Sequence, residues 1–76
     1  ANGQIETLQF QIKEANKMTA KPLSQLKLKK GVLIAAIIRK GKTIFPTGED
    51  MLEVGDKLLV TTLLPNITKI YDLIER

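Results

Sequence analysis

The chain contains no cysteine, no histidine and no tryptophan among its 76 residues. Without cysteine there is no disulfide framework, no zinc ribbon and no thiol nucleophile, and the composition suits a reducing compartment. Without histidine the most common general base and the imidazole ligand of metal sites are both missing. The sequence also shows no nucleophile with a base beside it. We therefore expect neither an enzyme nor a metal site.

Long apolar runs are missing as well. The longest uncharged apolar run covers residues 32–38, far short of the ~20 residues that a membrane-spanning helix needs. A hydrophobic content of 43% is nevertheless too high for a disordered segment. A chain of this size buries only ~60% of the surface that its unfolded form exposes. We expect one small globular domain over residues 1–76, of modest stability and without direct membrane insertion.

Each sign of charge is absent from one stretch of the chain. Twelve Lys and Arg face eight Asp and Glu, a net charge of +4. Residues 17–42 include eight basic residues and no acid, whereas residues 49–56 include four acids and no base. The two stretches can steer an anionic ligand or pair with each other, and a solvated lysine-rich face is the ordinary alternative. The acids lack the spacing of an EF-hand loop, so we expect ion pairs and turn contacts, with Asp56 bonding to the turn backbone beside Gly55.

Period-two alternation and one apolar run predict four strands. Alternation predicts strands over residues 4–13 and 57–64. Residues 32–38 suit a central strand that is buried on both faces, or one that is buried in an interface. A tight turn at Lys40 and Gly41 leads into a returning strand over residues 42–45.

Two short helices are expected beside these strands. Pro22 suits a first helical position, and the leucine spacing predicts about two turns over residues 22–28. Apolar side chains at i, i+3, i+4 and i+7 predict a helix over residues 67–74, capped by Asn66. Residues 16–21 are expected to form a loop. The predicted fold is α+β: a small two-layer domain in the order β-α-β-β-β-α, with a mostly antiparallel or mixed four-stranded sheet.

Several motifs together resemble the TrkA C-terminal domain, which is also called the C-terminal half of an RCK domain (regulator of potassium conductance). They are the run GVLIAAIIR at residues 31–39, P-x-G at residues 46–48 and L-x-x-G-D-x-L-x-V at residues 52–60. Residues 8–12 resemble the opening strand of that family, and P-L-x-x-L-x-L at residues 22–28 resembles its short helix. Each motif alone is unspecific, so the order and spacing carry the resemblance, which covers nearly the whole chain.

The resemblance implies a regulatory, ligand-sensing and dimerising domain of a Trk- or Ktr-type potassium uptake system or a related cation transport system. Such domains are cytoplasmic and peripheral to the inner face of the membrane, where the full-length homodimer docks on a potassium-translocating membrane subunit. NAD or ATP binds in a preceding Rossmann domain, and this chain has no G-x-G-x-x-G. We therefore interpret it as a fragment of a longer protein, with no cofactor of its own. The main alternative is a purely structural dimerisation module of another transporter.

The resemblance also implies candidate ligand contacts. In relatives that bind cyclic di-AMP, a basic residue after the short helix, the next strand and the proline loop approach the ligand. The matching positions are Lys29, Ile34 and Pro46, with Arg39 nearby in the sequence. Those relatives usually carry Arg where this chain has Lys29, and lysine cannot form the bidentate fork that grips phosphate, which argues against cyclic di-AMP here. A solvated lysine and a strand-ending proline are the plainer interpretations of Lys29 and Pro46.

A nucleic-acid-binding module is the remaining alternative, because of the basic stretch. Binders of single strands add aromatic stacking platforms to a positive groove. The aromatic residues are Phe10, Phe45 and Tyr71, and the patterns place Phe10 and Tyr71 in the core. We therefore expect no nucleic-acid partner.

Overall fold

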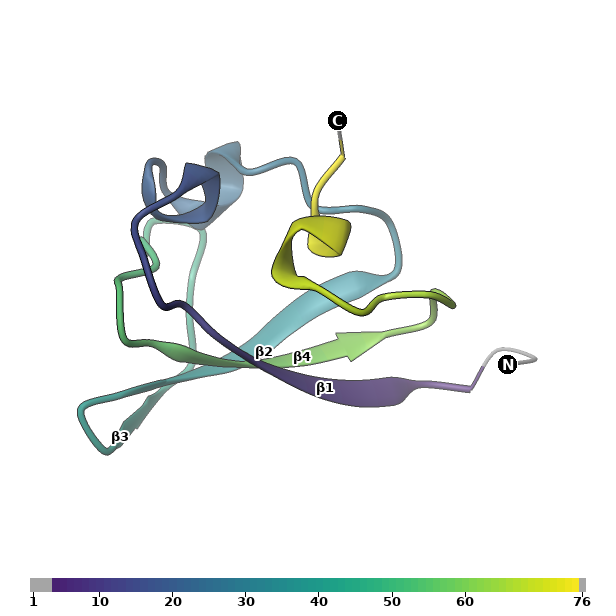
Figure 1. The fold of residues 1–76 in the computed structure, drawn as a ribbon, viewed down its shortest axis with the longest axis horizontal. Coiled ribbons are helices and arrows are strands. Elements are labelled where there is room, and N and C mark those ends of the chain that lie inside the picture. The colour runs from purple at the N-terminus through teal and green to yellow at the C-terminus, as the bar shows by residue number, and fades with distance from the viewer. Residues whose placement is uncertain (1–3, 76) are drawn as a thin grey trace.

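A computed structural model describes residues 4–75 and contains one four-stranded sheet (Figure 1). The strands are β1 (Glu6–Gln11), β2 (Val32–Arg39), β3 (Lys42–Ile44) and β4 (Lys57–Thr62). Their order across the sheet is β1-β4-β2-β3, and every neighbouring pair is antiparallel. The four predicted strands and the antiparallel pairing are confirmed. The first and last strands are shorter than predicted.

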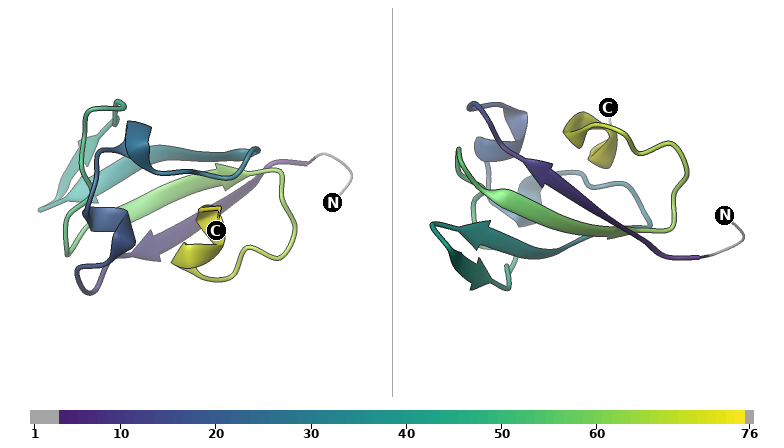
Figure 2. Two further views of the ribbon diagram at one scale, coloured as in Figure 1. Left: turned by 90° about the horizontal axis from the view of Figure 1, so that it is seen from above. Right: turned by 60° about the horizontal axis from the view of Figure 1, so that its bottom comes forward.

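Three short helical turns form the second layer. They are the 3-10 turns η1 (Lys17–Thr19), η2 (Leu23–Gln25) and η3 (Ile70–Leu73). All three lie on the same face of the sheet in Figures 1 and 2. Residues 4–75 contain no α-helix, so the two α-helices expected from the sequence are replaced by single 3-10 turns. The turn η1 occupies part of the predicted loop.

Long-range pairing explains why neither predicted helix forms. The backbone becomes extended at Leu26 (φ −83°, ψ 134°), and two residues later Leu28 forms an antiparallel β-bridge with Ile74. This bridge holds both segments in extended form where the leucine and isoleucine spacing favoured helix, because tertiary contacts override weak local propensity. Asn66 has a φ of 66° and Lys69 is the residue before η3, so the predicted cap at Asn66 is wrong.

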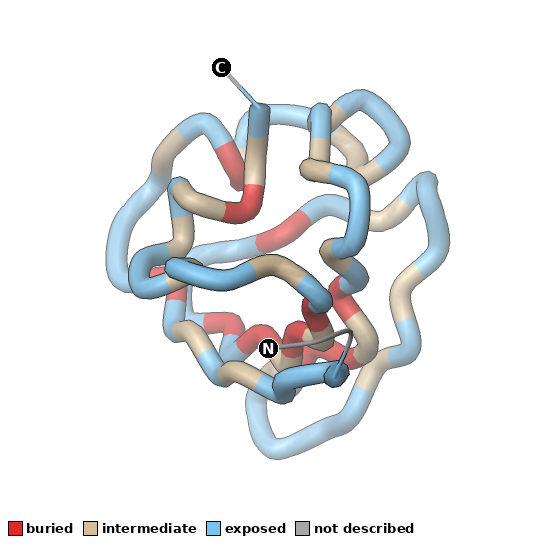
Figure 3. Tube along the Cα trace, turned by 90° about the vertical axis from the view of Figure 1, so that its right-hand side faces the viewer, coloured by how far each residue is buried: buried red, intermediate tan, exposed pale blue. Residues whose placement is uncertain are grey.

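The core lies between the sheet and the three turns. The predicted alternation of β4 is confirmed, since Leu58, Val60 and Thr62 are buried. The buried hydrophobic cluster draws on the sheet, the turns and the connecting loop; it consists of Ile12, Met18, Ile34, Ile37, Leu52, Leu58, Val60 and Leu73. Figure 3 shows these buried stretches gathered inside the fold. Leu73 lies within η3, so its burial fixes the C-terminal segment against the core.

The outer face of the sheet is not covered by any element of residues 4–75 (Figure 2). β2 therefore buries Ile34 and Ile37 on its inner side but leaves Leu33 61% exposed and Ile38 37% exposed. A register shift between Ile34 and Ala36 marks a β-bulge in this strand. Burial of the strand on both faces is thus not achieved within one chain, and the interface alternative stays open.

Two turns form where the sequence predicts them. Lys40 and Gly41 both have positive φ, 52° and 77°, the pattern of a tight hairpin turn. Gly55 has a φ of 96°, and the N–H of Asp56 donates to the carbonyl of Glu53 over 3.1 Å. These two turns confirm the predictions. No helix of the described residues has the length and apolar character needed to cross a membrane.

Candidate functional site

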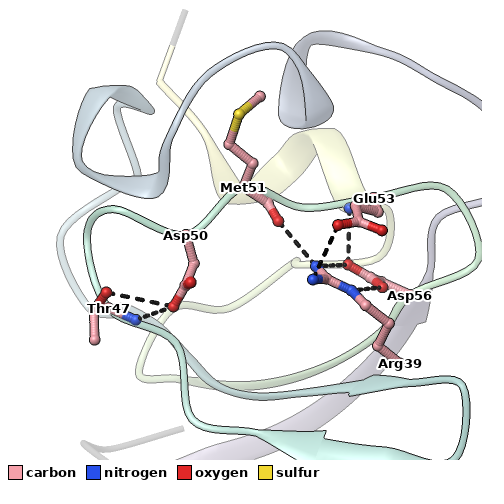
Figure 4. Close-up of polar contacts among 6 residues, drawn as sticks. All are labelled: Arg39, Thr47, Asp50, Met51, Glu53 and Asp56. Carbon is pink, nitrogen blue, oxygen red and sulfur yellow. Dashed lines mark hydrogen bonds and ion pairs between the residues drawn. The ribbon is translucent and has the colours of Figure 1, made fainter.

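Arg39 is the centre of one charged cluster, at the end of β2. Its Nε and Nη2 atoms donate to the two carboxylate oxygens of Asp56, each over 2.8 Å. Nη2 also donates to the carbonyl of Met51 over 2.9 Å, and Nη1 lies 3.1 Å from Glu53. Figure 4 shows the guanidinium group held between these partners. This bidentate arrangement is the strongest form of an arginine–carboxylate pair.

Asp56 is the buried partner of this pair, with 1% of its surface exposed. It also accepts the backbone N–H of Glu53 over 2.8 Å. Burial alone would raise the pKa of Asp56, but the hydrogen bonds from Arg39 and Glu53 and the positive charge of Arg39 outweigh it, so this pKa lies below its ordinary value. The hydrogen bond to Asp56 in turn raises the pKa of Arg39. Both groups therefore carry their full charge at neutral pH.

This Arg39 cluster anchors the loop between β3 and β4. The N–H of Gly55 donates to the carbonyl of Ile12 over 2.7 Å, and the N–H of Ile12 donates to the carbonyl of Asp56 over 2.9 Å. Asp50 accepts the N–H of Thr47 over 2.7 Å (Figure 4). Three of the four acids of the stretch, Asp50, Glu53 and Asp56, thus serve ion pairs or turns, as predicted. No group of three or more potential metal ligands occurs within residues 4–75.

A second charged region lies on the face of the turns, where three lysines surround a hollow of about 620 Å³. Lys17 belongs to η1, Lys69 precedes η3, and Lys29 lies between η2 and β2. We call this the lysine hollow; its lining residues are Lys17, Lys29, Lys69, Tyr71, Asp72, Ile74 and Glu75. Three segments that are far apart in the sequence therefore contribute one cation each.

The C-terminal segment forms a wall of the lysine hollow. The N–H of Lys29 donates to the carbonyl of Leu73 over 2.9 Å, and the N–H of Glu75 donates to the carbonyl of Lys27 over 2.7 Å. A smaller hollow of about 390 Å³ adjoins the lysine hollow; this second hollow shares Lys17, Ile74 and Glu75 with the first and adds Lys21 and Lys27. Backbone pairing thus holds the segment of Lys27 and Lys29 against the C-terminal segment, and the two hollows together are lined by five lysines.

No ion pair found within the described part of the chain involves these lysines. Both ion pairs found there are made by Arg39. Asp72 lines the lysine hollow, but one of its oxygens already accepts the N–H groups of Thr68 and Lys69, over 2.9 and 3.0 Å. These backbone hydrogen bonds lower the pKa of Asp72, and the positive charge of Lys69 also contributes to lowering it. Glu75 is exposed and is the other acid of the hollow.

The four residues proposed as ligand contacts do not gather in one place. Lys29 lines the lysine hollow and is half-buried. The side chain of Ile34 is buried in the core, and the guanidinium group of Arg39 is engaged by Asp56. Pro46 is half-buried just beyond β3. Of the four, Lys29 is thus the one that lines the lysine hollow.

Sequence reasoning missed most of the lysine hollow. Lys17 was noted only as part of the basic stretch, and Lys69 was not singled out. Tyr71, which was expected in the core, is 50% exposed at the hollow. No local pattern signals these positions, because they lie on three segments that meet only in the folded chain, two of them joined by the bridge between Leu28 and Ile74.

An apolar groove opens at one end of the sheet. It has a volume of about 260 Å³, and its lining residues are Ile5, Gly31, Val32, Leu33, Thr61, Thr62 and Leu63. Ile5, Leu33 and Leu63 are 69%, 61% and 50% exposed. Exposed apolar side chains grouped in this way are typical of contact surfaces.

Comparison with known proteins gives consistent matches. Residues 8–75 match the sequence model of the TrkA-C domain. The chain is 29% identical over 58 residues to Trk system potassium uptake protein TrkA homolog 1 of Methanosarcina mazei, and 27% identical over 60 residues to TrkA homolog 2 of the same organism. These matches cover 76% and 79% of this chain but 13% of each relative. The chain thus spans a small part of the length of the proteins it matches.

Proposed function

Because this chain belongs to the TrkA-C domain family, we propose that it is a regulatory, ligand-sensing and dimerising domain of a potassium uptake system. The family match over residues 8–75 carries the proposal, and the names of the Methanosarcina mazei relatives support it. The domain then acts as one piece of a longer cytoplasmic protein, peripheral to the inner face of the membrane, and it has no catalytic role. Its partners are a second copy and a potassium-translocating membrane subunit.

The proposed mechanism is a coupling between ligand binding and assembly. A ligand shifts a two-state assembly only by the difference in its affinity for the two states. A site formed by segments that move between the states supplies such a difference. Regulation of transport then follows from the change in the assembly, with no chemical step in this domain.

Dimerisation is supported by the uncovered outer face of the sheet. Leu33 and Ile38 lie on that face, and Leu33 also lines the apolar groove with Ile5 and Leu63. A chain of this size has a small core of its own, so burial of these side chains against a second copy adds to its stability. A two-fold contact at this face would bury the apolar residues of both copies together.

Sedimentation equilibrium tests this arrangement. At tens of micromolar the chain should be a dimer, and Leu33→Asp should shift it to a monomer because a buried unpaired carboxylate is costly. Val54→Asp is the matched control, since Val54 is 55% exposed in a turn; it should leave the dimer intact. A wild-type chain that stays monomeric at this concentration contradicts the dimer.

Potassium transport is tested in the intact protein that contains this domain. Rubidium uptake should change when the domain is removed or carries Leu33→Asp, while the Val54→Asp protein behaves as wild type. Unchanged uptake in both altered proteins contradicts the regulatory function. A thermal-shift screen with nucleotides, cyclic dinucleotides and cations separates a sensing domain from a purely structural dimerisation module, because a ligand that binds the folded form raises its stability.

A further inference from the structure

We propose that the lysine hollow binds a small soluble anion that carries two or more linked phosphate groups. This inference deepens the proposed function, on which it rests for its regulatory purpose, by naming the class of ligand to be sensed. The binding site itself is argued from the lysines, their surroundings and the shape of the hollow.

The first observation is a group of three lysines that make no ion pair within residues 4–75. Lys17, Lys29 and Lys69 lie around one hollow, and neither ion pair found within residues 4–75 involves them. Lysine ammonium groups are compact cations with three donors each, and they bind phosphate as point charges. Three such groups around one concave surface can contact the same multiply charged anion together, which lysines spread over a convex surface cannot do.

The second observation concerns the two acids of the hollow. Asp72 points one oxygen at backbone N–H groups of Thr68 and Lys69, and the Thr68 hydroxyl lies 3.2 Å from the same oxygen. These contacts hold the start of η3 and lower the pKa of Asp72, to which the positive charge of Lys69 also contributes, so Asp72 keeps its negative charge in the hollow. Glu75 is exposed and is the second acid that opposes an anion. Three lysines against two acids leave the hollow with a net charge of +1, and Lys21 and Lys27 of the neighbouring hollow add two further positive charges.

The third observation is the size and construction of the hollow. Its volume of about 620 Å³ lies within the range of small-molecule sites, about 300–1,000 Å³. The neighbouring hollow shares the wall at Ile74 and Glu75 and adds Lys21 and Lys27. Backbone hydrogen bonds and the buried Leu73 fix this wall, so the cations are attached to an ordered frame. An elongated anion with several phosphates can contact lysines from more than one segment.

Calorimetric titration of the 76-residue chain with sodium tripolyphosphate tests the site. At 50 mM salt we expect saturable binding of one ligand per chain, weakened when the salt is raised to 300 mM. Lys17→Gln and Lys69→Gln should each raise the Kd by about tenfold, as expected for the loss of one charge-assisted hydrogen bond. Glu75→Gln should lower the Kd by about twofold, because it removes one of the two opposing charges.

Lys42→Gln is the matched control, since it removes the same charge from the first position of β3, outside both lysine-bearing hollows. It should change the Kd by less than twofold, and thermal unfolding should confirm that all variants are folded. No binding of tripolyphosphate at 1 mM, or an equal loss of affinity in Lys42→Gln, overturns the proposal. Binding to anionic lipid vesicles or to oligonucleotides, without binding to tripolyphosphate, overturns it as well.

Failure of the proposed binding site can be distinguished from failure of the proposed regulatory function. Binding that depends on Lys17 and Lys69, together with unaltered rubidium uptake on removal of the domain, supports the site and contradicts its regulatory purpose. Absence of binding, together with a dimer and altered uptake, overturns the site and leaves the regulatory function standing.

Discussion

The Arg39 cluster and the lysine hollow differ in how their positive charges are paired. Arg39 is surrounded by Asp56, Glu53 and the carbonyl of Met51, all within 3.1 Å. The lysines of the hollow come from three segments and have no ion pair within the described residues. The comparison teaches that the basic stretch is not uniform: Arg39 pairs with the acidic stretch, whereas Lys17 and Lys29 line a hollow together with Lys69, which lies outside the basic stretch.

The two kinds of cation suit these two environments. The planar guanidinium group can satisfy a buried carboxylate bidentately, so its fixed position offsets the desolvation of Asp56. The lysine ammonium group is strongly hydrated and mobile, so it costs little to leave in water and remains available to an anion. We infer that the Arg39 cluster serves the fold and that the lysine hollow serves recognition. The predictions below test this division through stability and charge.

Asp56→Asn should have the largest effect on stability. It removes the carboxylate that pairs with Arg39 and that accepts the Glu53 N–H. We expect the free energy of unfolding to fall by about 3 kcal/mol, which is the lower end of the cost of breaking a buried ion pair, because Arg39 is partly exposed. Urea unfolding followed by circular dichroism measures it.

Glu49→Gln provides the control for that measurement, because Glu49 is an exposed acid of the same stretch. It should change the free energy of unfolding by less than about 0.5 kcal/mol. Equal losses in the two variants would show that the acidic stretch acts through overall charge and not through the Asp56 contacts.

At acid pH the wild-type chain and Asp56→Asn should differ less in their free energy of unfolding than they do at neutral pH. The pKa of Asp56 is below its ordinary value of 3.8 in the folded chain. Its contribution to stability is therefore fully present well above pH 3.8 and is lost as the pH falls through the lower, folded-state pKa. Unfolding measured from pH 6 to pH 2 should show the two curves converging below about pH 4.

Taking the difference between these two proteins removes the parallel effect of Asp72, whose pKa is also lowered. Curves that stay parallel down to pH 2 would mean that ionisation of Asp56 does not stabilise the fold.

The Arg39 cluster and the strands show what the sequence could predict. Alternating side chains located β1 and β4, and glycine spacing located the turns at Gly41 and Gly55, because these features depend on a few neighbouring residues. The same local reasoning linked Asp56 to turn chemistry and the acidic stretch to ion pairing. It did not identify Arg39 as the partner, since the strand and the loop that carry them are joined only by the folded sheet.

The C-terminal segment shows why the rest could not be predicted. Its isoleucine spacing fits a helix, yet the chain forms a single 3-10 turn so that Ile74 can pair with Leu28. The choice depends on a segment more than forty residues away, which no local pattern contains. The lysine hollow is built on this pairing, so the position of Lys69 beside Lys29 was equally hidden from sequence reasoning.

Arg39→Lys should have an intermediate effect. Lysine keeps the positive charge but cannot reproduce the two parallel hydrogen bonds to Asp56 or the contact with the Met51 carbonyl. We expect a loss of about 1.5 kcal/mol in the free energy of unfolding, roughly that of one hydrogen bond to a charged group. Glu53→Gln is the comparison variant; Glu53 is 59% exposed, so it should cost about 0.5 kcal/mol or less. Similar losses in the two would assign the stabilisation to surface charge pairing.

Neutralising the lysine hollow should have the smallest effect on the free energy of unfolding. It should raise this free energy, whereas the variants of the Arg39 cluster lower it. In the triple variant Lys17→Gln, Lys29→Gln and Lys69→Gln, no ion pair of the described residues is broken, and repulsion among like charges is relieved. We expect the free energy of unfolding at 10 mM salt to rise by up to about 0.5 kcal/mol, and this gain to vanish at 0.5 M salt, where the charges are screened. A salt-independent loss of about 2 kcal/mol or more would mean that these lysines support the fold as Arg39 does. The division between a structural and a recognition region would then fail, because a cation kept available for a ligand contributes little to the stability of the empty domain.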